Sequence, residues 1–336
     1  MGLIPYILKR LAAAIPVLLG VTVLVFLISH AIPGDPARMM AGQKASREAV
    51  ENIRRSLGLD RPLPEQYARY LGDLLQGDLG TSIRNHRPVT EDLKDFFPAT
   101  LELTLASMAL CIGVGLPLGV WAAVRRNRIA DHLIRVFSVV GVSTPVFWLG
   151  LMLLALFYRN LGLLPGSGRL DMAFSPPAHV TGLYLIDSLL AGRLDIFVNA
   201  LRHILLPAFC LSYVYLAIVT RIVRSAMIEV MGQDYITTAV ANGLPPFRVI
   251  LRHALKNSLI PTVTIVGLSI GELLGGAVLT ETIFSWPGMG KYVVDSVNYL
   301  DFPAIMGFTL MVSLAYVLIN LAVDVIYALL NPQIRY

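Results

Sequence analysis

Residues 11–30 read LAAAIPVLLGVTVLVFLISH, an apolar run that follows directly on Lys9 and Arg10. A helix needs about 20 apolar residues to cross the hydrocarbon core of a bilayer, whereas the apolar core of a secretory signal has only about 7–15. The run therefore predicts a membrane-spanning helix. Because residues 29–31 (SHA) faintly resemble a signal cleavage site, a cleaved leader stays open as the alternative for this segment.

The whole chain has the composition of a membrane protein. Of its 336 residues, 56% are hydrophobic and 15% are charged, and the mean hydropathy is +0.68. Soluble domains are nearer half apolar and one quarter charged. We predict an all-α integral membrane protein with six transmembrane helices, at residues 11–30, 101–124, 134–158, 203–223, 259–282 and 306–329.

The basic residues of the short loops fall on one side of these six spans, and that side is cytoplasmic because basic residues resist translocation. An even number of spans places both termini there as well. The net charge of +5 is thus a topology signal and does not indicate a nucleic-acid partner. The residues concerned are Lys9, Arg10, Arg125, Arg126, Arg128, Arg135, Arg221, Arg224, Arg248, Arg252, Lys256 and Arg335.

Three parts follow from this topology: residues 1–31 with the first span, the outer segment 32–98, and the transmembrane part 99–336. The outer segment carries ten basic and ten acidic side chains, as expected of a solvated segment. We predict two short amphipathic helices in it, one from Ser46 as N-cap to Gly58 and one from about Pro64 to Gly77. The segment is a small lid rather than an independent domain.

A second outer segment, residues 159–202, is rich in Pro and Gly. Its apolar stretch from Leu183 to Leu190 is too short to span a bilayer, and we expect a re-entrant or surface-lying helix there.

The cytoplasmic loop 224–258 is far longer than a turn between two helices requires. Asp234 can cap a short helix over 235–241, Gly243 stands where a left-handed helix terminator belongs, and two prolines follow. A second amphipathic helix would carry Arg248, Arg252, His253 and Lys256. This rigid excursion indicates an element that a partner holds, and an ordinary amphipathic connector is the alternative.

Residues 234–261, DYITTAVANGLPPFRVILRHALKNSLIP, resemble the cytoplasmic loop of ABC importer permeases, in the form found in the peptide and nickel import family. In that family the short helix inserts into a groove of the ATPase subunit. The chain departs from the general importer pattern, because Thr237 and Thr238 replace a Glu and an Ala, and Lys256 replaces a Pro. The ATPase-coupling residues that the resemblance implies are Asp234, Tyr235, Thr238, Ala239, Ala241 and Gly243.

The resemblance extends along nearly the whole chain, through 58–82, PATLELTL at 98–105, STPVFWLGL at 143–151 and ETIFSWPGMGKYV at 281–293. The long outer segment before the fourth span is most similar to that of the B-type subunits of dipeptide permeases. The resemblance implies a multi-pass bacterial inner-membrane subunit of an importer of dipeptides or short peptides. Nickel, glutathione, oligopeptides and haem stay open as substrates.

The partners that the resemblance implies are a second, homologous permease subunit, two ATP-binding subunits, a periplasmic peptide-binding protein and membrane lipid. ATP and Mg²⁺ would be used by the ATP-binding subunits, so we expect this chain to hold no cofactor and to be non-catalytic.

Charged side chains inside spans mark candidate residues of a translocation path, since each costs at least about 2.5 kcal/mol in hydrocarbon. Glu272 shares its helix face with Ser269, and Asp324 continues a polar stripe at steps of three and four residues. The stripe consists of Ser313, Tyr316, Asn320 and Asp324. A structural role for both carboxylates between helices is the alternative, and the position of Asp324 near the cytoplasmic end favours a gate or an anchor.

Two further features concern helix packing. Gly267, Gly271 and Gly275 repeat at intervals of four, a pattern that allows helices to approach closely, and we expect it to pack against a partner subunit. Pro145, after Thr144, should kink the third span because proline removes one hydrogen bond of the helix.

Several motifs are missing from the sequence. It contains no G-x-x-x-x-G-K-[ST] phosphate loop, no H-E-x-x-H and no nucleophile elbow. Cys111 and Cys210 stand alone in separate spans, so no disulfide or metal knot is predicted. ATP must therefore be bound elsewhere. A proton-coupled secondary transporter that uses Glu272 and Asp324 is the main rival, and a passive channel is the second.

Overall fold

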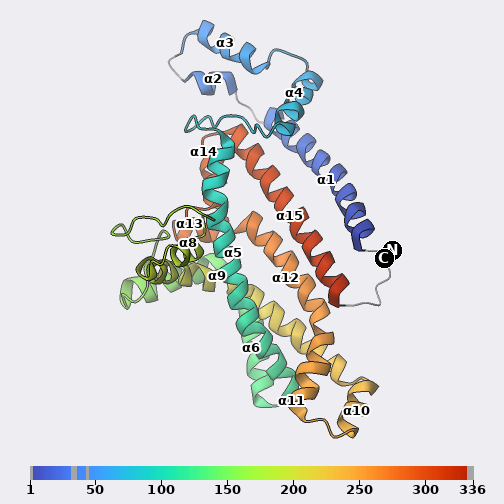
Figure 1. Cartoon of the computed structure of the whole chain (residues 1–336). Coiled ribbons are helices and arrows are strands. Elements are labelled where there is room, and N and C mark those ends of the chain that lie inside the picture. Colours follow the sequence, from blue (N-terminus) through green and yellow to red (C-terminus); the bar gives the residue numbers. More distant parts are fainter. Residues whose placement is uncertain (1–2, 32–35, 43–44, 331–336) are drawn as a thin grey trace.

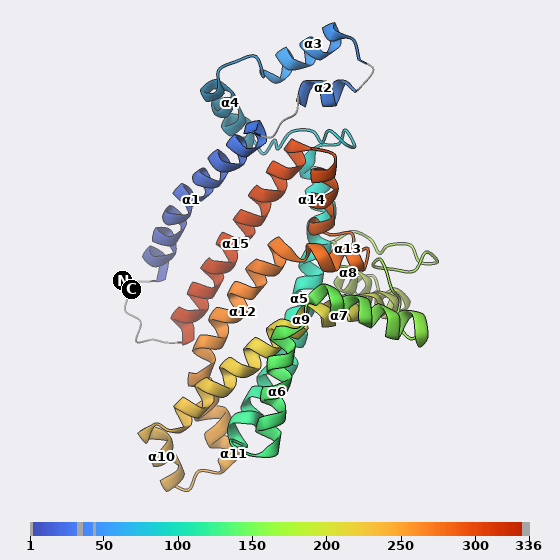
Figure 2. The same ribbon diagram turned by 180° about the vertical axis from the view of Figure 1, so that it is seen from behind.

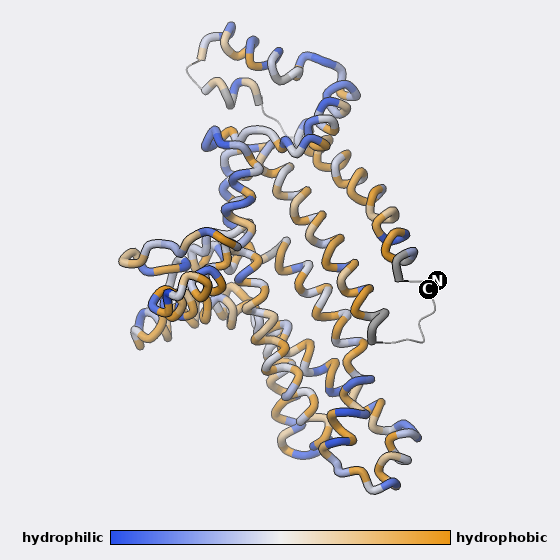
Figure 3. Tube along the Cα trace, viewed as in Figure 1, coloured by the Kyte–Doolittle hydropathy of each residue, from blue (hydrophilic) through white to orange (hydrophobic). Residues whose placement is uncertain are grey.

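The computed structural model of the chain describes residues 3–31, 36–42 and 45–330 (Figure 1). Within these ranges the regular elements are helices, and extended backbone pairs only in a single bridge between Thr81 and Pro88. Apolar residues line the long helices, whereas polar residues gather at the end formed by the outer segment and at the opposite end (Figure 3). The predicted all-α class is confirmed.

Five helices of the described part are long and apolar enough to cross a membrane, and a bent pair makes six if its two halves form one span. The helix ends differ most from prediction at α5 and α9. These two helices begin 12 and 9 residues before the predicted spans, which start at 101 and 203. Their first turns carry charged residues, which a search for apolar runs excludes. The five are α1 (Leu3–Ala31), α5 (Val89–Val124), α9 (Leu194–Met231), α12 (Lys256–Gly276, with the turns before it) and α15 (Phe302–Leu330).

The bent pair is the third predicted span. It consists of α6 (Ile129–Ser143) and of α7 (Val146–Leu153) with the π-helical η1 (Leu154–Asn160), and its halves meet at 101°. Proline at 145 lacks an N–H group and forces the residue before it out of the helical region, and Thr144 is accordingly extended. The kink is therefore present at the predicted position, and the helix axis changes direction there by 101°.

The outer segment forms the helices α2 (Pro36–Ala41), α3 (Arg47–Leu57) and α4 (Leu63–Leu75) beyond the outer end of α1 (Figures 1 and 2). Ser46 caps α3 by accepting a hydrogen bond from the Ala49 N–H at 3.2 Å, and Gly58 ends it with φ of 69°. Both amphipathic helices predicted for this segment are thus confirmed. A hydrogen bond of 2.9 Å between the hydroxyls of Thr22 and Tyr67 joins α1 to α4.

The second outer segment is fastened to α5 by buried charges. Glu102 accepts hydrogen bonds from Arg169 at 2.5 Å and from the Leu185 N–H at 2.7 Å, and Arg169 also donates to the Gly182 carbonyl at 2.9 Å. The Arg169 guanidinium lies 3.5 Å from the ring centroid of Tyr184. The short predicted helix is present as α8 (Tyr184–Leu190).

A buried carboxylate organises the third outer loop, which contains α13 (Val278–Ile283) and α14 (Met289–Asn298). Glu281 accepts hydrogen bonds from the Thr100 hydroxyl at 2.6 Å and from the Lys291 N–H at 3.0 Å, at the first turn of α14. Its pKa is raised because it is buried. A carboxylate from another helix therefore caps α14.

The glycine stripe of α12 packs against α15 of the same chain, and the predicted contact with a partner subunit is corrected accordingly. A Cβ at Gly267 would overlap Val323, one at Gly271 would overlap the Tyr316 ring, and one at Gly275 would lie 3.2 Å from Val312 Cγ1. Figures 1 and 2 show α15 between α1 and α12. The small residues let two neighbouring spans of one chain approach closely.

Gly271→Leu should destabilise the chain by about 1–3 kcal/mol, because the new side chain must displace the Tyr316 ring from a packed interface. Thermal unfolding of the purified protein in detergent measures the loss. Gly113→Leu on α5 is the matched control, since nothing lies within 4 Å of a Cβ built there. Equal stability of the two variants would contradict the packing assignment.

Candidate functional site

The cytoplasmic loop forms a short helix at one end of the molecule, α10 (Asp234–Ala241), followed by α11 (Pro246–Arg248) (Figure 2). Gly243 has φ of 73°, the left-handed conformation predicted for the terminator. The prediction that Asp234 caps the helix is corrected: Gln233 occupies the N-cap position, and Asp234 is the first helical residue. Its exposed carboxylate still stabilises the helix, because a negative charge near the N-terminus interacts favourably with the helix dipole.

One face of α10 packs inward. Ile236 and Ala239 are buried in the main apolar cluster, together with Val249 and Ala254 from the segment that follows. The predicted contact between Ala239 and an ATPase therefore does not fit this structure, in which Ala239 serves the packing of the loop itself.

Apolar groups of α10 and α11 are also exposed to solvent. Val240 is 59% exposed and Phe247 is 73% exposed, and Ala241 and Gly243 are exposed between them. We call Val240, Ala241, Gly243 and Phe247 the coupling surface. Val240 and Phe247 are absent from the coupling residues predicted from the sequence. Val240 lies four residues from Ile236, and the sequence alone does not show which of the two is buried and which is exposed.

A polar clasp joins α10 to the segment that leads into α12. Asn257 Nδ2 donates to the Tyr235 hydroxyl oxygen at 2.8 Å, and that hydroxyl lies 3.4 Å from the His253 carbonyl oxygen. His253 belongs to η2 (Val249–Leu255), a π-helix that runs from α11 into α12. The second amphipathic helix predicted for this loop is thus continuous with the fifth span. The Thr238 hydroxyl donates to the Asp234 carbonyl of the same helix at 3.0 Å.

A buried ion pair holds the helices next to the loop. Arg224 of α9 donates to both oxygens of Asp131 on α6, at 2.5 and 2.8 Å, and Asp131 also accepts from the Asn127 N–H at 2.9 Å. The sequence pattern indicates Arg224 only as a topology charge, because its partner lies 93 positions away.

The candidate residues of the translocation path do not converge on one place in this chain. Glu272 is exposed and accepts a hydrogen bond from the Tyr215 hydroxyl of α9 at 3.3 Å. Ser269 is buried and donates to the Ile265 carbonyl of its own helix at 2.7 Å. Glu272 is therefore the exposed carboxylate of this set, and its role in a path stays a prediction.

The polar stripe of α15 is divided between its two neighbours. Tyr316 lies against Gly271 of α12, whereas Asp324 pairs with Arg10 of α1 at 3.0 and 3.3 Å. Ser313 bonds to the Thr309 carbonyl at 2.7 Å, and Asn320 is half-buried. The ion pair supports the anchor interpretation of Asp324. In the described residues, no three His, Cys, Asp or Glu side chains are placed to hold a metal ion.

Two family models cover almost the whole chain. Residues 3–104 match the N-terminal region of binding-protein-dependent transport system membrane components, and residues 115–336 match the inner membrane component of these systems. The chain therefore belongs to the family of inner membrane components of binding-protein-dependent transport systems. It is a multi-pass inner-membrane permease subunit of a transporter complex.

Among its relatives, the probable D,D-dipeptide transport system permease protein DdpB of Escherichia coli K12 is 56% identical over 97% of this chain and 96% of that protein. The dipeptide transport system permease protein DppB of the same strain is 44% identical over 99% of each chain. The glutathione transport system permease protein GsiC of Salmonella paratyphi A is 41% identical over 98% of this chain and 99% of that protein.

Proposed function

We propose that this chain is one of two permease subunits of an ATP-driven importer of dipeptides and short peptides. The names of relatives that are 44–56% identical over nearly the full length support the substrate class. The observation that carries the mechanism is the coupling surface, a set of exposed residues on α10, on α11 and in the turn between them. A hydrogen bond between Tyr235 and Asn257 joins α10 to the base of α12. Exposed apolar groups on a rigid element are typical of a protein interface.

The coupling surface provides a mechanical link. Two ATPase subunits would each hold one such helix, and their closure on ATP and Mg²⁺ would move α10. The buried face of α10 and the Tyr235–Asn257 hydrogen bond would pass that movement to η2 and α12. A second, homologous permease would complete the aqueous path, and a periplasmic binding protein would deliver the peptide to the outer face. In this scheme the chain binds no cofactor and catalyses no reaction.

Reconstitution of the complete complex in proteoliposomes tests this function. ATP-dependent uptake of D-Ala-D-Ala and L-Ala-L-Ala should exceed uptake of glutathione, and it should stop when ATP is depleted. Uptake that follows a pH gradient and continues without ATP would show a proton-coupled secondary transporter instead. Uptake that needs neither ATP nor a gradient would show a passive channel.

A further inference from the structure

A cavity of about 670 Å³ lies on the outer side of the chain, between the outer segment and the ends of two membrane helices. Its volume falls within the roughly 300–1,000 Å³ of small-molecule sites. We call it the outer cavity. Its walls come from the outer end of α1, from α4, from residues 78–83 and from the first turns of α15, with Arg54 and Leu59 at one edge.

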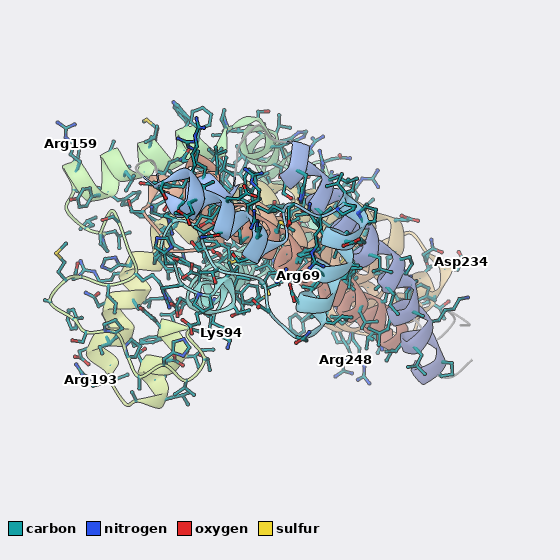
Figure 4. The ribbon with its side chains drawn as sticks, turned by 90° about the horizontal axis from the view of Figure 1, so that it is seen from above. Arg69, Lys94, Arg159, Arg193, Asp234 and Arg248 are labelled. Carbon is teal, nitrogen blue, oxygen red and sulfur yellow. The ribbon has the colours of Figure 1, made fainter. Side chains whose placement is uncertain are left out.

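One face of α4 forms a polar wall of the outer cavity. Gln66, Arg69, Tyr70 and Asp73 all line it, and their steps of three and four residues place them on the same side of the helix. Figure 4 looks down on this end of the molecule and shows Arg69 nearer its middle than Arg159 or Arg193. A short ligand in the cavity would therefore meet a cationic and an anionic group, four residues apart.

These two charges lack ion-pair partners among the described residues, whereas Arg54 and Asp78 of the same cavity have partners. Arg54 pairs with Glu51, and the Asp78 carboxylate accepts a hydrogen bond from the Gly80 N–H at 2.8 Å. Neither Arg69 nor Asp73 takes part in a salt bridge or a side-chain hydrogen bond within the described part of the chain. Both residues are exposed, so water solvates the two charges and leaves them available to a ligand.

Tyr70, between these charges in the sequence, has a buried hydroxyl with no hydrogen-bond partner within the described part of the chain. Burial raises the pKa of Tyr70 to about 12, so the hydroxyl keeps its proton and is available as a donor. Buried polar groups without a partner are rare, because each costs the free energy of its lost hydration. The hydroxyl oxygen is closed to solvent, however, so Tyr70 lines the cavity with its ring and not with its hydroxyl.

The part of the wall that comes from α1 and α15 is largely apolar, and we call it the aromatic floor. Phe26 of α1 stacks on the Tyr70 ring, with centroids 6.0 Å apart, and Phe302, Pro303 and Met306 come from α15. An aromatic floor with a few placed polar groups is typical of a site that binds a small organic molecule.

We infer that the outer cavity binds a free zwitterionic dipeptide, whose carboxylate pairs with Arg69, whose ammonium group pairs with Asp73 and whose side chain rests on the aromatic floor. The termini of an extended dipeptide are at most about 7 Å apart, close to the roughly 5–6 Å between the Cβ atoms of residues four apart on a helix. A tripeptide, at about 10 Å, exceeds that separation. The substrate class rests on the proposed function.

The test measures equilibrium binding of radiolabelled Ala-Phe to the assembled transporter in lipid nanodiscs, without its periplasmic binding protein. Arg69→Gln should weaken binding of Ala-Phe at least tenfold and leave binding of Ala-Phe amide, which has no carboxylate, unchanged. Asp73→Asn should weaken binding of Ala-Phe equally and leave binding of N-acetyl-Ala-Phe unchanged. Tyr70→Phe should leave binding unchanged, because the hydroxyl does not reach the cavity, and Ala-Ala-Phe should bind more weakly than Ala-Phe.

Asp60→Asn and Arg55→Gln are the controls, because both residues are exposed in the outer segment and neither lines the cavity. These variants should bind Ala-Phe as the wild type does. Losses at Arg69 and Asp73 that are equal for the free and the capped peptides would show a purely structural role and overturn the inference. A lipid that stays in the cavity in the presence of excess peptide would overturn it too.

ATP-driven uptake by the wild type, measured on the same preparation with the binding protein added, separates this inference from the proposed function. Uptake of Ala-Phe together with unchanged binding in the Arg69 and Asp73 variants would refute the outer cavity alone. Binding that depends on both residues, in a transporter that does not use ATP for uptake, would refute the proposed function alone.

Discussion

Replacing Phe247 by Ala and Val240 by Ser together should lower ATP-dependent import at least tenfold while the protein stays inserted and folded. Both side chains are exposed in the isolated chain, so their truncation removes little internal packing. Buried apolar anchors at the centre of an interface contribute about 2 kcal/mol or more each, equivalent to roughly thirtyfold in affinity. Co-purification of the ATP-binding subunits with the variant permease measures the loss directly.

The matched control for this variant is the replacement of two exposed apolar residues on the outer side, Val180→Ser with Met172→Ala, whose side chains are likewise exposed. The control should retain its ATPase subunits. The pair Ala239→Trp and Ala241→Trp adds a second comparison, because Ala239 faces the interior of the loop and Ala241 faces outward. We expect Ala239→Trp to lower thermal stability and Ala241→Trp to release the ATPase. Normal import by the Phe247 and Val240 variant would disprove the coupling surface.

Arg169→Met should lower the free energy of unfolding by about 3–5 kcal/mol, because it leaves the Glu102 carboxylate buried without its partner. The side chains of the pair are each only 6% exposed, so water cannot replace the lost charge without opening the loop. Thermal unfolding and proteolysis between residues 161 and 193 report the release of the second outer segment from α5.

Arg193→Met serves as the control for Arg169, since Arg193 pairs with Asp195 at 2.7 Å with side chains 56% and 48% exposed. Exposed pairs contribute only about 0–1 kcal/mol. Adding Glu102→Gln to Arg169→Met should recover part of the loss, because the double variant no longer buries an unpaired charge. Equal destabilisation by the Arg169 and Arg193 variants would show that burial of this pair has no special importance.

Local signals predicted the elements that depend on neighbouring residues. Ser46 and Gly58 delimit α3 as expected, and Gly243 ends the cytoplasmic excursion in the predicted left-handed conformation. The proline at 145 marked the break in the third span. These features follow from backbone sterics and capping within a few residues, so one stretch of sequence contains the information.

Contacts between distant segments were beyond the reach of sequence patterns. The glycines of α12 indicated close packing, but the periodicity of one helix does not reveal whether its neighbour belongs to the same chain. Likewise, the step of three between Ile236 and Ala239 defines a face of α10 without saying that it points inward. Glu102 and Arg169 are 67 residues apart, and neither stood out as a partner of the other.

The ion pair between Arg10 and Asp324 has a consequence for biosynthesis, because its members are 314 residues apart. At about 5–20 residues per second, the carboxylate is made roughly 15–60 s after the guanidinium. During that interval α1 must reside in lipid without the neighbour that it later packs against. It is also the most apolar of the candidate spans, which suits a helix that has to insert independently. The contact between the first and the last span therefore forms only at the end of synthesis, after Asp324 has been made.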